Sequence, residues 1–63
     1  MPIVQIHMLE GRTTEERRAL AERMTDAICE TIGAERERVR IIMNDMPRDE
    51  YAVGGKLVCD QDY

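Results

Sequence analysis

The chain contains few side chains that could transfer a proton near neutral pH. A general acid–base catalyst works best when its pKa lies near the working pH, and histidine is the usual choice. The one histidine, His7, lies among apolar neighbours in a segment with the pattern of a strand. We therefore interpret His7 as a packed, hydrogen-bonded side chain rather than a base. No Ser/His/Asp set, Cys/His pair or glycine-rich phosphate loop is evident in the sequence.

The second near-neutral group is the amine that Pro2 would present once Met1 is removed. A free α-amine titrates at about 7.7–8.0 in model peptides, and burial or nearby cations lower the pKa of such an amine. A proline at position 2 usually allows removal of the initiator methionine. Many proteins begin with Met-Pro for no catalytic reason, so Pro2 by itself is only a candidate for the catalytic base.

Two arginines strengthen the case for Pro2. Arg12 follows the first predicted strand and Arg40 lies near the start of the second. Each could bind a carboxylate through two parallel hydrogen bonds, although a surface salt bridge is the alternative for either one alone. Together they make a small carboxylate a candidate ligand.

The spacing of these residues makes a demand on assembly. Pro2 and Arg12 flank a predicted strand, which at roughly 3.3 Å per residue separates them by more than about 20 Å. Arg40 begins a parallel strand and so lies at the Pro2 end. If Pro2 and Arg12 serve one site, a neighbouring chain must supply Arg12.

Two segments, residues 3–9 and 39–46, have the apolar pattern of strands that are covered on both faces. Pro47 ends the second segment. The sequence Tyr51-Ala-Val-Gly-Gly predicts a short hairpin. The acidic residues 58–63 are expected to form a loosely held tail.

A helix is predicted between the strands. Thr13 and Glu16 have the spacing of a capping box, and apolar residues then recur at three- and four-residue intervals to about Ile32. Gly33 is suited to the left-handed conformation that ends helices. Strand, helix and strand in this order predict a right-handed crossover between two parallel strands.

Size and composition point to an oligomer. The 63 residues allow one domain, residues 1–63, and domains this small usually need disulfides, a metal or oligomerisation. Cys29 and Cys59 form no disulfide framework, and His7 has no partner at a metal-site spacing. One helix covers one face of the sheet. We expect the other, also apolar, face to be buried against another subunit.

The composition also bears on partners. The net charge is −4, and nine basic residues are scattered among thirteen acidic ones, which argues against nucleic acid as a partner. The apolar runs are too short to cross a membrane. Free thiols and no recognisable targeting segment favour the cytoplasm.

Several segments together resemble the 4-oxalocrotonate tautomerase (2-hydroxymuconate tautomerase) family. The resemblance runs from residue 2 to about residue 57 and is carried by Met-Pro-Ile-Val-Gln-Ile-His-Met-Leu-Glu-Gly-Arg with Thr-Thr-Glu-Glu after it, by Val39-Arg40-Ile41-Ile42 and by Tyr51-Ala-Val-Gly-Gly. It implies an α/β (α+β) fold, in which a β-α-β protomer with a C-terminal hairpin pairs with a partner into a four-stranded sheet. It also implies a homohexamer, a trimer of dimers, with no metal and no cofactor.

The same resemblance implies an activity and roles. The family converts 2-hydroxymuconate into 2-oxohex-3-enedioate. By analogy Pro2 is the base and then the acid, Arg40 binds the carboxylate and 2-hydroxyl end, and Arg12 of another subunit binds the distal carboxylate. The resemblance leaves open whether Arg40 comes from the same chain as Pro2 or from a neighbouring one. Tyr51 stands where a phenylalanine normally forms a wall of the site, so its hydroxyl either donates to the substrate or only packs.

Three alternatives stay open. The substrate could be another 2-hydroxydienoate or a phenylenolpyruvate-like enol. Relatives that hydrate haloacrylates use an extra carboxylate, whereas this chain has Ala52-Val53 there, with Glu50 as the nearest acid. From a different class, the protein could be a non-catalytic oligomeric binding module, which would require a blocked Pro2 or arginines held in salt bridges.

Overall fold

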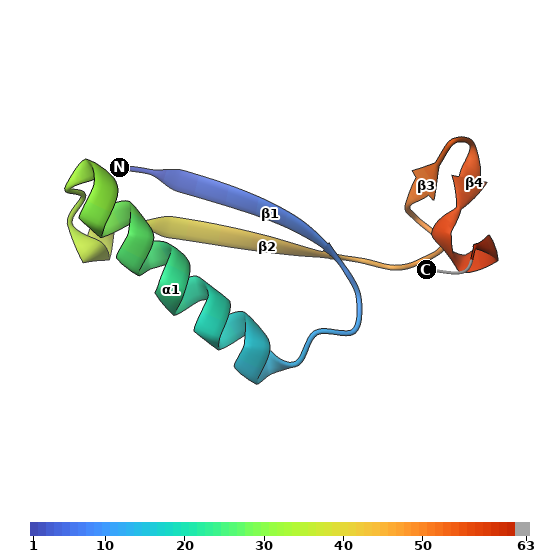
Figure 1. Cartoon of the computed structure of the whole chain (residues 1–63), viewed down its shortest axis with the longest axis horizontal. Helices are drawn as coiled ribbons and strands as arrows, with labels where there is room; N and C mark the ends of the chain where they lie inside the picture. Colours follow the sequence, from blue (N-terminus) through green and yellow to red (C-terminus); the bar gives the residue numbers. More distant parts are fainter. Residues whose placement is uncertain (62–63) are drawn as a thin grey trace.

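The computed structural model describes residues 1–61, which form a β-α-β unit followed by a hairpin (Figure 1). The elements are strand β1 (Ile3–Leu9), helix α1 (Thr14–Ile32), the short 3₁₀ helix η1 (Arg36–Arg38), strand β2 (Arg40–Met46), strands β3 (Ala52–Val53) and β4 (Lys56–Leu57), and the 3₁₀ helix η2 (Val58–Asp60). The predicted order and kinds of element are confirmed. The second strand begins at Arg40, one residue later than expected.

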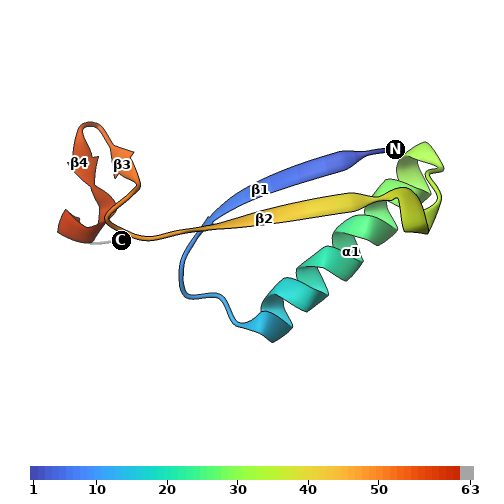
Figure 2. The same ribbon diagram turned by 180° about the vertical axis from the view of Figure 1, so that it is seen from behind.

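The two long strands are parallel and in register from Ile3 beside Arg40 to Leu9 beside Met46. Helix α1 returns the chain from the end of β1 towards the start of β2 and lies on one side of the pair (Figures 1 and 2). An ion pair of 2.8 Å between Arg17 of α1 and Asp45 of β2 shows which face of β2 the helix covers. As far as His7 and Asn44, side chains alternate accordingly, half-buried under the helix and exposed on the opposite face.

The face without a helix differs from the apolar face that we expected. Ile3 and Ile42 are 58% and 46% exposed there, but Gln5, His7 and Asn44 occupy the same face in register. The Nδ1 atom of His7 lies 3.4 Å from Nδ2 of Asn44. His7 is therefore hydrogen-bonded across the strands, as predicted, but it is exposed in the protomer rather than packed.

Helix α1 is bounded by the residues that the sequence singled out. The Glu16 amide donates to Oγ1 of Thr13 at 3.1 Å, and the Thr13 amide donates to the Glu16 carboxylate at 3.0 Å. This backbone bond from Thr13, and more weakly the charge of Arg12, lower the pKa of Glu16. At the other end Gly33 adopts a φ of 70° and donates to the carbonyl of Cys29. Both helix ends are thus satisfied locally.

Replacing Thr13 by alanine is expected to destabilise the protein by about 1 kcal/mol per protomer, because the hydroxyl that accepts from the first turn is lost. Urea unfolding of Thr13→Ala at a fixed protomer concentration measures the change, since the stability of an oligomer depends on concentration. Thr14→Ala is the matched control, because Thr14 is already the first residue of the helix. Equal losses in the two variants would contradict a capping role for Thr13.

The C-terminal hairpin lies beyond the ends of β1 and β2, away from the helix (Figures 1 and 2). Strands β3 and β4 pair antiparallel around Gly54 and Gly55, whose φ angles of 62° and 83° suit glycine. The amide of Val58 donates to the carbonyl of Tyr51 at 2.8 Å, and Val58 is fully buried. Residues 58–61 therefore differ from the loose tail that we expected; residues 62 and 63 lie outside the described part.

The protomer buries very little on its own. Within residues 1–61, Val58 is the only fully buried apolar side chain, and helix α1 contains no buried residue. The large apolar side chains that stay exposed are Met1, Ile3, Ile32, Ile42, Tyr51, Val53 and Leu57. A chain with so small a core needs further apolar contacts to be stable, which is the expectation that composition raised. No helix in the described part is long and apolar enough to cross a membrane.

Candidate active site

Pro2 and Arg40 meet at the end of the sheet where both strands begin. The amide of Arg40 donates to the carbonyl of Pro2 at 3.0 Å, which continues the ladder between Ile3 and Arg40. This bond uses the carbonyl and not the ring nitrogen of Pro2. Met1, which precedes it, is 70% exposed. Removal of Met1 would free the amine without breaking the bond that holds Pro2 in place.

Arg40 keeps most of its hydrogen-bonding capacity. Its Nη1 atom donates to the carbonyl of Glu37 at 2.9 Å, and no carboxylate in the described part of the chain forms a salt bridge with it. A guanidinium carries five donors in a planar fork. The bond to Glu37 fixes one arm, so the remaining donors stay available for an anion.

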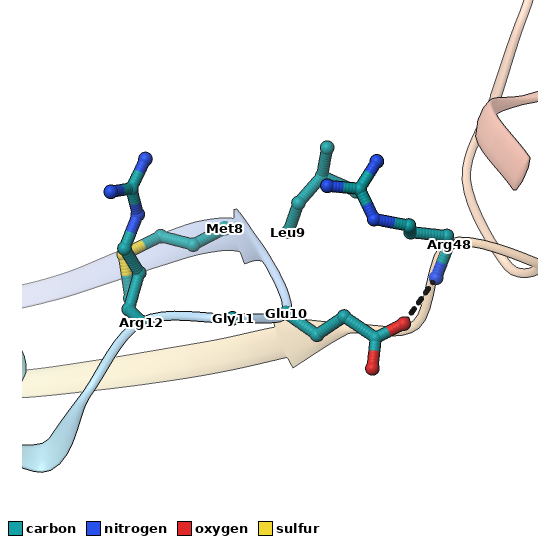
Figure 3. A pocket seen from close by; sticks show the side chains of 6 residues that line it. All are labelled: Met8, Leu9, Glu10, Gly11, Arg12 and Arg48. Carbon is teal, nitrogen blue, oxygen red and sulfur yellow. Dashed lines mark hydrogen bonds between the residues drawn. The ribbon is translucent and has the colours of Figure 1, made fainter. Parts of the chain in front are cut away.

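Arg12 lies at the opposite end of the sheet, in the loop after β1. It lines an open hollow of about 620 Å³, a volume within the roughly 300–1,000 Å³ of small-ligand sites. The other lining residues are Met8, Leu9, Glu10, Gly11 and Arg48 (Figure 3). Within one protomer the structure therefore separates Arg12 from Pro2 by the length of β1, as the spacing predicted.

The only carboxylate within salt-bridge distance of Arg12 in the described part is that of Glu16, and the contact is loose. Nη1 of Arg12 lies 3.9 Å from Oε2 of Glu16, and 64% of the Arg12 side chain is exposed. The other oxygen, Oε1, already accepts the capping bond from Thr13. Exposed pairs of this kind contribute about 0–1 kcal/mol. The Arg12 guanidinium is thus free to bind an anion.

Arg48 is a residue of this hollow that the sequence reasoning missed. It follows Pro47 directly after β2, and its amide donates to the carboxylate of Glu10 at 2.9 Å. A signal was present: the ends of two parallel strands meet at one edge of the sheet, so the basic residue after the second strand lies beside the turn after the first.

Tyr51 directly precedes strand β3 of the hairpin, which lies at the opposite end of the molecule from the start of β1 (Figure 1). Its side chain is 38% exposed, and its carbonyl accepts from Val58. Within the protomer, Pro2 therefore lies beside Arg40 at one end of the sheet, and Arg12 and Arg48 line one hollow at the other end. Tyr51 lies beyond that end, next to the hairpin. The four residues predicted for the site do not come together within one chain.

Cys59, in the 3₁₀ helix η2 after the hairpin, is a second potential nucleophile. Loss of water contact, followed by the negative charge of Asp60, raises the pKa of the Cys59 thiol. A raised pKa disfavours the thiolate, which is the reactive form. Cys59 is thus a poor competitor of the Pro2 amine for proton transfer or nucleophilic attack.

Comparison with known proteins identifies the family. Residues 2–61 match the family model described as tautomerase enzyme. The chain is 45% identical over 62 residues to the 2-hydroxymuconate tautomerase of Bacillus subtilis, covering 98% of this chain and 100% of the relative.

Two solved structures extend the likeness to three dimensions. The crystal structure of a homologue of 4-oxalocrotonate tautomerase superposes with a TM-score of 0.92 at 44% identity, over 97% of this chain and 100% of that one. A heterohexamer 4-oxalocrotonate tautomerase from Chloroflexus aurantiacus gives a TM-score of 0.89 at 31% identity, over 98% and 100%. With its β-α-β unit and its match over residues 2–61, the chain belongs to the tautomerase family of enzymes.

Proposed function

We propose that this protein is a 2-hydroxydienoate tautomerase, with 2-hydroxymuconate as substrate, and that the amine of Pro2 moves the proton. The observation that carries the proposal is the backbone bond between Arg40 and Pro2. It holds a future amine beside an arginine that has no carboxylate partner in the described part of the chain. A 45% identical relative named 2-hydroxymuconate tautomerase supports the choice of substrate.

The chemistry follows from these groups. The nitrogen lone pair of Pro2 takes the proton of the 2-hydroxyl, and the O–H bond breaks as the C2–O double bond forms. The C2–C3 double bond moves to C3–C4, and the electrons of the C4–C5 double bond form a new C–H bond as Pro2 returns the proton to C5. Arg40 binds the first carboxylate and the oxygen at C2, where charge develops. Arg12 binds the second carboxylate and draws electron density towards it.

The site is completed by a second subunit. The protomer separates Pro2 from Arg12 and leaves Ile3 and Ile42 exposed, so a partner that covers these side chains can bring its own Arg12 to Pro2. A heterohexameric relative at 31% identity supports an assembly of six chains, and the family resemblance implies that these form a trimer of dimers. Tyr51, on the protruding hairpin, would form a wall of a neighbour's site. Free Cys29 and Cys59 fit a reducing compartment such as the cytoplasm.

A non-catalytic binding module is the rival proposal, and the arginines weigh against it. Such a module would require either a blocked Pro2 or arginines held in salt bridges, and Arg12 has only a contact of 3.9 Å while Arg40 bonds to a carbonyl. The intact mass of the natively expressed protein separates the two proposals, because a retained Met1 leaves Pro2 as an amide with no basic lone pair.

The direct test follows the loss of ultraviolet absorbance of 2-hydroxymuconate with wild-type protein and Arg40→Ala. We expect kcat/KM to fall about 10- to 100-fold in the variant, since a hydrogen bond to a charged group contributes roughly 1.5–3 kcal/mol and about 1.4 kcal/mol is tenfold. Arg38→Ala is the matched control, because Arg38 is an exposed arginine paired with Glu35 at 3.2 Å. A wild-type protein without turnover would refute the proposed substrate, and equal effects of the two substitutions would refute the role of Arg40.

A further inference from the structure

Two arginines from separate parts of the chain line the hollow at the ends of β1 and β2. Arg12 comes from the loop after β1 and Arg48 from the segment after β2. In Figure 3 the Arg12 side chain extends upward and the Arg48 side chain extends back towards Leu9, while the Glu10 carboxylate is turned to the Arg48 amide. We propose that Arg48 acts with Arg12 as a second cation for the distal carboxylate, and that this pair makes the enzyme selective for substrates with two carboxylates. This inference rests on the proposed function.

Two backbone hydrogen bonds hold Arg48 in place, and neither of them involves its side chain. Its amide donates to Oε2 of Glu10 at 2.9 Å, and its carbonyl accepts from the amide of Cys59 at 3.1 Å. Pro47, directly before it, further restricts the chain. The exposed Arg48 guanidinium makes no salt bridge with a carboxylate in the described part. The backbone is thus anchored while the charge stays available.

The charge and lining of the hollow suit the end of a dicarboxylic acid. It contains two arginines and one carboxylate, that of Glu10, so it is locally positive on a chain whose net charge is −4. The Glu10 carboxylate already accepts the amide of Arg48. Met8 and Leu9 supply an apolar wall for a carbon chain. Two planar guanidinium groups can each offer paired donors to one terminal carboxylate.

The kinetic test compares a diacid with a monoacid. We expect Arg48→Ala to raise KM for 2-hydroxymuconate about tenfold, which corresponds to one charge-assisted hydrogen bond, and to leave KM for 2-hydroxypenta-2,4-dienoate nearly unchanged. Arg23→Ala, on the exposed side of α1, removes the same charge far from the hollow and controls for long-range attraction. Alanine retains both backbone bonds of Arg48, and Arg48→Gln provides a second variant of similar length.

A binding test works without turnover. Calorimetric titration with hexanedioate and hexanoate, which are saturated and unreactive, should show tighter binding of the diacid by the wild type and loss of this preference in Arg48→Ala. In a double-mutant cycle on hexanedioate, the effects of Arg12→Ala and Arg48→Ala should be non-additive, because both residues hold the same group.

The outcomes distinguish this inference from the proposed function. Equal binding of both acids by the wild type, additive effects of the two substitutions, or the same change in Arg23→Ala as in Arg48→Ala would overturn the role of Arg48. A protein that fails to convert 2-hydroxymuconate but prefers hexanedioate through Arg12 and Arg48 would refute the proposed reaction and keep the anion pair. If 2-hydroxymuconate is converted but Arg48→Ala leaves the selectivity for diacids unchanged, the proposed reaction stands and the role of Arg48 is refuted.

Discussion

Blocking the amine of Pro2 is expected to cause the largest loss of activity of any single change to this protein. A version with one extra residue that is not removed ahead of Pro2 carries an amide in place of the amine. General acid–base catalysis contributes about 10²–10⁴-fold to a rate, so kcat should fall by this factor or more. The measurement is 2-hydroxymuconate turnover by the trimmed and the blocked protein, each checked by intact mass.

Pro2→Ala tests the same group more gently. It presents a primary amine at the same place, because the backbone bond to Arg40 uses the carbonyl of residue 2. We expect a smaller loss of kcat than in the blocked protein. In the wild type, kcat/KM should fall as the pH drops through the pKa of the amine, since the base must be unprotonated. A blocked protein as fast as the trimmed one would show that Pro2 is not the base.

A carboxylate on the open face of the sheet is expected to break the assembly and abolish activity together. Ile42 is 46% exposed on the face that no helix covers, so Ile42→Asp would place a charge in the proposed subunit contact. An unpaired buried charge costs several kcal/mol per ion. Sedimentation should therefore show smaller species, and the rate should drop because Pro2 and Arg12 no longer share a site.

The controls separate assembly from local damage. Ile42→Val keeps an apolar side chain and should stay assembled and active. Arg23→Asp places a carboxylate on the exposed side of α1, away from the proposed contact, and should stay assembled and active as well. Mixing Pro2-blocked subunits with Arg12→Ala subunits should restore turnover of 2-hydroxymuconate, because some sites then receive both native residues. A monomeric Ile42→Asp protein with full activity would contradict a site that is shared between chains.

The elements themselves could be predicted because their signals are local. The capping box of Thr13 and Glu16, the left-handed Gly33 and the paired Gly54 and Gly55 each act within a few residues, and short-range backbone chemistry determines them. The parallel arrangement followed from the right-handed crossover rule. The separation of Pro2 and Arg12 followed from the length of a strand.

Other features depend on which segments meet in space. The Arg48 amide donates to the carboxylate of Glu10, 38 residues earlier in the chain, and this bond holds Arg48 at the hollow that Arg12 lines. Val58 became the buried residue of the hairpin because the chain after β4 turns back to Tyr51. Neither contact has a local signal, since each one joins segments whose approach is decided by the strand register and the turn between them.

Pro2 shows most directly what the sequence determines and what the tertiary structure decides. The sequence by itself determined that an amine could be exposed at position 2 and that Arg12 lies a strand's length away. Only the tertiary structure decided that the amide of Arg40 bonds to Pro2 and that polar side chains such as His7 lie on the open face. The physical reason is register: side chains alternate with a period of two, so a shift of one residue between β1 and β2 would move every side chain of the shifted strand to the other face.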